Sequence, residues 1–185
     1  RHVEGILGRN CALTRQALRR AGDLRADVGS GTDYHLAKSL RAAGIAIRHE
    51  PASTVATGYP TSAGQYIRQQ RRWLRNLVLH GLHFGAFREA ATSLVTSCIG
   101  LGMLLAPLAA ILLGPSVLAL WALAVIHSAM AKLRYLAFTA VRYAPDGPSL
   151  SPANAIEAVQ LTFVEFFAWA QPLLDYAIPS RRSAW

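Results

Sequence analysis

The sequence predicts an α-rich membrane protein in which a basic part of the chain precedes long hydrophobic helices. Residues 1–90 hold 14 of the 19 Lys and Arg residues but only 6 of the 10 Asp and Glu residues. Between Glu89 and Lys132, no charged residue occurs over about 42 positions. Because roughly 20 apolar residues cross a bilayer once, this stretch is long enough for two crossings.

The basic part begins with short elements. Residues 5–13 have the composition of a glycine-punctuated strand or loop, and Thr14 can cap a helix that extends through Ala21. Farther along, residues 45–48 alternate isoleucine with alanine and arginine, which is typical of a half-buried strand.

A second helix is expected over residues 33–43. Thr32 is a suitable N-cap residue, and Gly44 suits the end of the helix. Asp33 would then lie in the first turn. The helix dipole and the free amide groups of that turn favour an ionised carboxylate.

A long amphipathic helix over residues 62–88 is the most informative predicted element. Gln69, Arg72 and Trp73 are spaced so that they share one face, and the polar stripe continues through Asn76. Leucine and valine side chains occupy another face. A basic, aromatic helix of this kind can lie along a membrane surface.

Two membrane spans are predicted to follow, at about residues 91–114 and 117–138. Lys132 and Arg134 lie near the end of the second span, where long basic side chains can extend towards the membrane surface. Because basic residues beside a span usually mark the cytoplasmic side, residues 1–90 are expected in the cytoplasm.

A third apolar segment covers residues 155–178, and the sequence leaves its membrane topology undecided. Glu157, Glu165, Asp175 and Pro172 make it a poor lipid-facing span. A protein-packed span, a re-entrant hairpin and an interfacial helix are the alternatives. We expect the two glutamates to pack against the other spans or to lie at the water interface.

Asp33 and the Gln69–Trp73 face supply the chemical groups that sugar transfer requires. A carboxylate such as that of Asp33 can accept the proton of an attacking hydroxyl. The guanidinium of Arg72 can form paired hydrogen bonds to a departing diphosphate. The indole of Trp73 offers a flat apolar face to a sugar ring, and the amide of Gln69 can bond a hydroxyl or phosphate oxygen.

Three blocks of the sequence resemble the last motifs of family-2 glycosyltransferases. They are residues 8–15 (GRNCALTR), 31–33 (GTD) and 69–73 (QQRRW), which occur in the family's order and are followed by apolar segments. The family includes the synthases of cellulose, chitin, hyaluronan and poly-N-acetylglucosamine, and ceramide glucosyltransferase. The motifs cover residues 5–90, and only hydropathy extends the resemblance beyond them.

The resemblance implies a multi-pass enzyme of the cell membrane whose catalytic part has the GT-A α/β fold and faces the cytoplasm. Asp33 would be the general base of an inverting transfer from a nucleotide-sugar, with UDP-sugars expected, to a polysaccharide or lipid-linked acceptor. Arg72 and Gln69 would contact the nucleotide diphosphate, and Trp73 the acceptor sugar. Membrane lipids are further expected partners, and nucleic acid is not.

Two departures from the family pattern limit what these residues can do. The family usually has Thr-Glu-Asp where residues 31–33 are Gly-Thr-Asp. The Asp-x-Asp motif, which would bind Mg²⁺ or Mn²⁺ in the intact enzyme, does not occur in this chain. Residues 1–61 are therefore interpreted as the C-terminal part of a GT-A domain, 62–90 as an interfacial helix and 91–185 as the membrane region. On this interpretation the N-terminal nucleotide-binding half is missing, and the chain alone is inactive.

A rival hypothesis is a non-enzymatic membrane protein whose basic amphipathic helix binds anionic lipids. Asp33 would then be an ordinary first-turn residue, and Trp73 a membrane anchor. His80 and His83 lack the further ligands of a metal site, so no metal ligands are predicted in this chain. Cys11 and Cys98 fall in different predicted regions, which argues against a disulfide framework.

Overall fold

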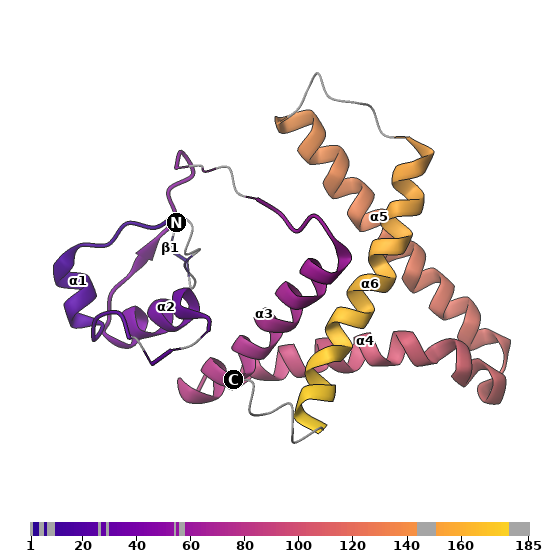
Figure 1. The fold of residues 1–185 in the computed structure, drawn as a ribbon, viewed down its shortest axis with the longest axis horizontal. Coiled ribbons are helices and arrows are strands. Elements are labelled where there is room, and N and C mark those ends of the chain that lie inside the picture. The colour runs from indigo at the N-terminus through magenta and orange to yellow at the C-terminus, as the bar shows by residue number, and fades with distance from the viewer. Residues whose placement is uncertain are drawn as a thin grey trace. The chain divides into compact units, whose positions relative to one another are not determined.

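A computed structural model describes residues 2–3, 6, 10–25, 27–28, 30–53, 55, 58–143 and 151–177. The elements, in chain order, are β1 (His2–Val3), α1 (Arg15–Arg20), α2 (Thr32–Ala42), β2 (Ile47–Arg48), α3 (Ala63–His83), α4 (Phe87–Leu113), α5 (Pro115–Tyr143) and α6 (Pro152–Ala177) (Figure 1). The chain forms two compact units. The first contains the described residues within 1–61, 72–94 and 175–177, and the second contains residues 62–71 and the described residues within 95–174.

The first unit contains the small sheet and the two short helices. β1 and β2 pair antiparallel, with His2 opposite Arg48. The Oγ1 atom of Thr14 accepts a hydrogen bond of 3.1 Å from the backbone amide of Ala17, so Thr14 caps α1 as predicted. Of the strand or loop predicted over residues 5–13, residues 5 and 7–9 lie outside the described part of the chain.

The predicted cap of α2 is wrong by one residue. Gly31, rather than Thr32, is the N-cap, and Thr32 is the first residue of the helix. Gly31 has a left-handed backbone conformation with φ of 70°, and it provides no side-chain hydrogen bond to the helix. The sequence pattern favoured Thr32 because threonine is a common cap, whereas packing against a neighbouring helix requires a glycine here, as described below.

The helix predicted over residues 62–88 is in fact two helices. The start is as expected, since the Ser62 hydroxyl accepts a hydrogen bond from the amide of Gln65. α3 ends at His83, however, and a turn with Gly85 at φ of 66° leads into α4. A 2.7 Å hydrogen bond from the amide of Ala86 to the carbonyl of Gly81 closes this turn.

The end of α3 and the start of α4 pack closely within the first unit. A Cβ atom on Gly81 would lie 3.2 Å from the Cβ of Ala90, so small residues allow the two backbones to approach. Farther from the turn, the Ser93 hydroxyl donates a 2.7 Å hydrogen bond to the carbonyl of Leu74. Ser93 is buried, and this bond gives its hydroxyl the hydrogen-bond partner that a buried polar group needs.

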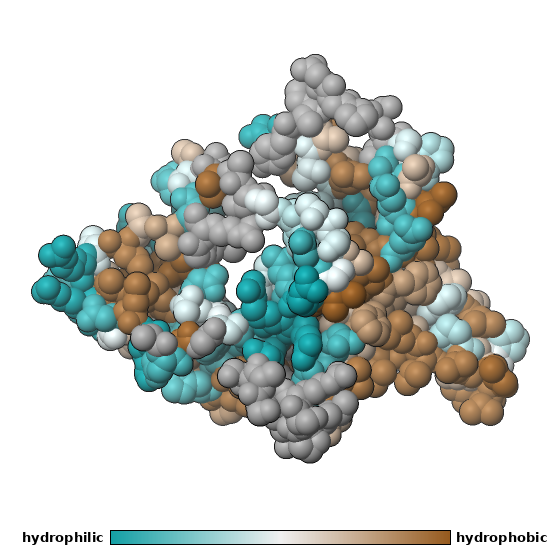
Figure 2. Space-filling model, viewed as in Figure 1, coloured by the Kyte–Doolittle hydropathy of each residue, from teal (hydrophilic) through white to brown (hydrophobic). Residues whose placement is uncertain are grey.

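α4 and α5 are the two helices in the described part of the chain that are long and apolar enough to cross a membrane. Both begin before the predicted span positions, at Phe87 and Pro115. Few side chains in either apolar segment are buried. Figure 2 shows the hydrophobic surface along α4, in contrast to the hydrophilic surface over α3. Such exposed apolar faces suit a lipid environment.

α6 is one continuous helix that includes Pro172, which excludes the re-entrant hairpin considered for this segment. Within the second unit, α6 packs on α4 at Gly100. A Cβ atom at Gly100 would lie 2.6 Å from the Cβ of Trp169 and 2.7 Å from the carbonyl oxygen of Phe166. Only glycine permits this approach, as in other close helix crossings in membranes.

We predict that Gly100→Ala lowers the free energy of unfolding by about 2 kcal/mol, because the added methyl group meets backbone atoms that cannot move away easily. Gly102→Ala is the matched control in the same helix, since a Cβ at Gly102 meets no atom within 4 Å. Thermal unfolding in one detergent compares the two variants. Equal melting temperatures would contradict the close packing of α4 and α6.

Candidate functional site

The predicted site residues lie on two helices. Asp33 is in the first turn of α2 and is half-buried, and its Oδ1 atom accepts a 2.9 Å hydrogen bond from the amide of Tyr34. Gln69, Arg72 and Trp73 lie on α3. Arg72 and Trp73 belong to the first compact unit together with Asp33, whereas Gln69 belongs to the second.

The exposure of the three α3 residues differs. Arg72 is exposed, and Trp73 keeps 47% of its surface accessible. The Oε1 atom of Gln69 is buried and has no hydrogen-bond partner among the described residues, and the same holds for Oδ1 of Asn76. Buried amide oxygens normally have a partner, so these two atoms are exceptions among the described residues.

The loop before Asp33 is held against α3. The Nε2 atom of His80 lies 2.9 Å from the carbonyl oxygen of Ser30, a hydrogen-bonding distance. A Cβ atom at Gly31 would lie 2.8 Å from Nδ2 of Asn76 and 2.9 Å from Nε2 of His80. This contact explains the glycine at the first position of the Gly-Thr-Asp block, because any side chain would displace the loop.

This contact also brings Asp33, which is distant in the sequence, towards the motif on α3. Asn76 lies one helical turn after Arg72, a rise of about 6 Å along the axis. Gly31, which packs on Asn76, is two residues before Asp33. The start of α2 therefore lies beside the turn of α3 that follows Arg72 and Trp73. The structure brings these three predicted residues into one region of the first unit.

A carboxylate of α4 also holds α2 in place. Both the Tyr34 hydroxyl and the Lys38 ammonium donate hydrogen bonds to Glu89. Lys38 is buried, so its ion pair with Glu89 compensates a charge that would otherwise lie in an apolar environment. Burial and the neighbouring Glu89 carboxylate raise the pKa of Tyr34 above its ordinary value. Tyr34 therefore remains a hydrogen-bond donor at neutral pH.

Aromatic rings fill the space between α2 and the end of α3. The ring of His35 lies 5.5 Å from that of His80 and 5.0 Å from that of Phe84, and the ring of His83 stacks on it at 5.9 Å. Burial, and then the two neighbouring histidines, lower the pKa of His35. The imidazole of His35 is therefore neutral at neutral pH.

A hollow of about 550 Å³ lies at the other end of α2. It is lined by Lys38, Arg41, Ala42, Phe84, Gly85, Ala86, Phe87, Arg88 and Glu89. None of the predicted site residues contributes to its wall. The hollow is therefore separate from the Asp33 region.

Four further residues support the site, and sequence reasoning gave them no role in it. Asn76 and His80 follow the motif on α3 at helical spacing, and this spacing was the available signal. Tyr34 and Glu89 are far apart in sequence, so no local pattern could have paired them. The sequence places His80 on the polar stripe of α3 without a partner, whereas the structure puts its Nε2 atom at hydrogen-bonding distance from the carbonyl oxygen of Ser30.

The residues present do not fit a divalent metal ion. The described residues contain no group of three His, Cys, Asp or Glu side chains that could hold one. The sequence also lacks an Asp-x-Asp motif.

The structure is that of a helix-rich protein with two long apolar helices and, within the first unit, a polar region that contains a carboxylate, a guanidinium and an indole. The family model of glycosyl transferase family group 2 matches residues 2–138. The chain belongs to this family. No curated protein and no solved structure significantly matches it. Glycosyl transfer is thus the general activity that the family indicates.

Gly31→Ala is predicted to lower the free energy of unfolding by about 1–3 kcal/mol more than Gly44→Ala. Both glycines have φ of 70°, so backbone strain is the same, but a Cβ at Gly44 meets no atom within 4 Å. The difference isolates the contact with Asn76 and His80. Urea unfolding in detergent measures it, and equal losses would contradict the packing of this loop on α3.

Proposed function

We propose that the intact protein is a membrane-bound, inverting glycosyltransferase that moves a sugar from a nucleotide-sugar to a polysaccharide or lipid-linked acceptor. A UDP-sugar is the proposed donor. The general activity follows from family membership, and the finer assignments are the proposal. The observation that carries it is the contact of the Ser30–Gly31 backbone with α3, which brings Asp33 towards the turn that follows Arg72 and Trp73.

In the proposed reaction, Asp33 is the general base. Its carboxylate accepts the proton of the acceptor hydroxyl as that oxygen attacks the anomeric carbon of the donor. The new glycosidic bond forms on the face opposite the leaving group. The bond from the anomeric carbon to the nucleoside diphosphate breaks at the same time, and the diphosphate leaves with the electron pair.

The residues of α3 bind the two substrates in this proposal. The Arg72 guanidinium forms paired hydrogen bonds to the departing diphosphate, whose negative charge increases as the bond breaks. The amide of Gln69 bonds the same group. The exposed indole of Trp73 provides a flat surface on which an acceptor sugar ring can stack.

α4 and α5 would anchor this site in the cell membrane as two of several spans, with the basic first unit on the cytoplasmic side. α6 would pack against them. The likeness to the polysaccharide synthases and to ceramide glucosyltransferase supports a GT-A fold for the whole catalytic domain. In that domain, an Asp-x-Asp motif, which does not occur in this chain, would hold Mg²⁺ or Mn²⁺ to the diphosphate that Arg72 and Gln69 also contact.

We expect Asp33→Asn to lower kcat of the intact protein by about 10²–10⁴-fold, because the amide cannot accept the proton. The affinity for UDP should change less than twofold. The measurement is sugar transfer from UDP-glucose and UDP-N-acetylglucosamine by membranes, with UDP binding by the purified protein.

Asp23→Asn is the control for this substitution. Asp23 is exposed and has φ of 60°, a conformation that asparagine tolerates well. It should leave transfer unchanged. Retention of full activity by Asp33→Asn would refute the assignment of the base.

A further inference from the structure

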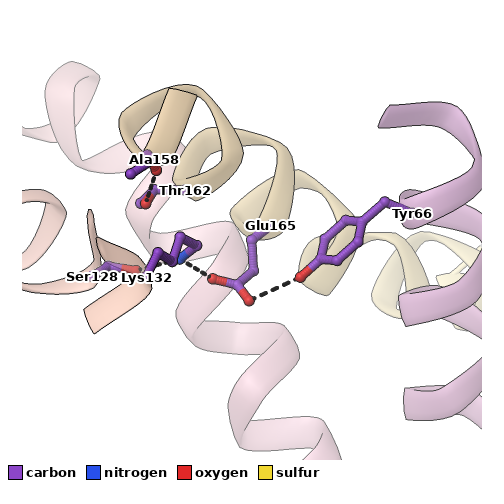
Figure 3. Close-up of polar contacts among 6 residues, drawn as sticks. All are labelled: Tyr66, Ser128, Lys132, Ala158, Thr162 and Glu165. Atoms are coloured by element: carbon purple, nitrogen blue, oxygen red, sulfur yellow. Dashed lines mark hydrogen bonds and ion pairs between the residues drawn. The ribbon is translucent and has the colours of Figure 1, made fainter. Parts of the chain in front are cut away.

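An ion pair lies among the helices of the second unit. The Nζ atom of Lys132 on α5 is 2.6 Å from Oε2 of Glu165 on α6, and it donates a 2.9 Å hydrogen bond to the Ser128 hydroxyl (Figure 3). The side chains of Lys132 and Glu165 are only 18% and 17% exposed. Lys132 therefore pairs within the second unit. The sequence predicts instead that it extends towards the membrane surface.

The second oxygen of the same carboxylate has a partner on α3. The Tyr66 hydroxyl donates a 3.1 Å hydrogen bond to Oε1 of Glu165. Tyr66 keeps only 7% of its surface exposed. Figure 3 shows its ring directed from α3 towards Glu165, with Lys132 on the other side of the carboxylate. A single carboxylate thus links three helices, α3, α5 and α6.

Burying the charges of Lys132 and Glu165 costs free energy, so chance packing does not explain why these two residues lie here. An ammonium and a carboxylate lose favourable hydration when they are buried, and a pair of this kind is often no better for stability than apolar residues of the same size. Ionisable groups inside apolar helices usually have a function. The geometry here fixes the first turns of α3, through Arg71, against α5 and α6, because each polar partner comes from a different helix.

Tyr66 is three residues before Gln69, so the two side chains lie on neighbouring turns of one helical face. The first turns of α3, through Arg71, belong to the same compact unit as α5 and α6. Rotation or sliding of α3 would therefore break the Tyr66–Glu165 bond and move Gln69 together with it.

We propose that Tyr66, Glu165 and Lys132 are positioning residues for sugar transfer, which hold α3 so that Gln69 meets the donor diphosphate. This inference rests on the proposed function. Beyond that function, it states that polar groups of the apolar helices α5 and α6 set the affinity for the nucleotide. None of the three residues needs to touch a substrate.

The test uses Tyr66→Phe in the intact protein, which removes one hydroxyl and keeps the ring. We expect about a tenfold rise in the Kd for UDP and in the donor KM, the loss expected for a hydrogen bond to a charged group. A merely structural role would lower the yield of active protein and Vmax but leave Kd and KM unchanged.

Thr162→Val is the matched control. Thr162 is fully buried one turn before Glu165, and its hydroxyl donates a 2.8 Å hydrogen bond to the carbonyl of Ala158 in its own helix (Figure 3). This variant disturbs a buried polar group of α6 and leaves the Glu165 contacts intact. Its Kd for UDP and donor KM should match those of the unmodified protein.

A double-mutant cycle with Gln69→Ala identifies the residue through which Tyr66 acts. If Tyr66 positions Gln69, Tyr66→Phe changes the Kd for UDP less than twofold once Gln69 is replaced. Full additivity of the two effects would overturn the proposal, as would an unchanged Kd in Tyr66→Phe alone.

The ion pair itself is tested by two further variants. Glu165→Gln leaves the Lys132 charge uncompensated and should reduce the amount of folded protein. Lys132→Met combined with Glu165→Gln removes both charges, keeps an oxygen for Tyr66, and should restore folding and most of the UDP affinity. Failure of the double variant to bind UDP better than Glu165→Gln would contradict the role assigned to the pair.

These outcomes separate the inference from the function on which it rests. If the unmodified protein transfers sugar and Tyr66→Phe retains its kinetics, the positioning role fails and the proposed function stands. If the unmodified protein neither binds UDP nor transfers sugar, both fail. A rise in Kd and donor KM that disappears in the Gln69→Ala background supports both.

Discussion

The close contact between the Ser30–Gly31 backbone and α3 is the constraint on which the first unit depends. The backbone approaches Asn76 and His80 so closely that no side chain fits at Gly31. His80 in turn binds the carbonyl of Ser30. Asp33 follows at once in the chain, so this contact determines where the carboxylate lies. Glu89 further stabilises α2 through Tyr34 and Lys38.

Much of the helical structure could be predicted from the sequence, because apolar periodicity and caps are local signals. Thr14 caps α1, and long apolar helices follow α3, as the pattern indicated. The break near Gly85 could not be predicted, since a single glycine is tolerated in many helices. The cap at Gly31 was missed because the reason for it is a contact with a helix about 45 residues away.

The candidate site shows the same division between local and distant signals. Asp33 and the α3 motif could be recognised because short blocks of residues carry them, and family membership agrees with that recognition. The residues that support Asp33 and the α3 motif could not be identified from the sequence. Tyr34, Glu89, Tyr66 and Glu165 acquire partners only when distant helices meet. Lys132 was expected at the membrane surface because a lone charge in an apolar segment usually extends there, whereas Glu165 provides a partner inside.

The central claim is that Asp33, Arg72 and Trp73 face one pair of substrates. The most direct measurement is a cryo-electron microscopy structure of the intact protein with UDP and a bound acceptor sugar. The account predicts the diphosphate within hydrogen-bonding distance of Arg72, the acceptor ring against Trp73, and a sugar hydroxyl within about 3 Å of the Asp33 carboxylate. A structure with both substrates bound and the Asp33 carboxylate directed away from the acceptor would contradict it.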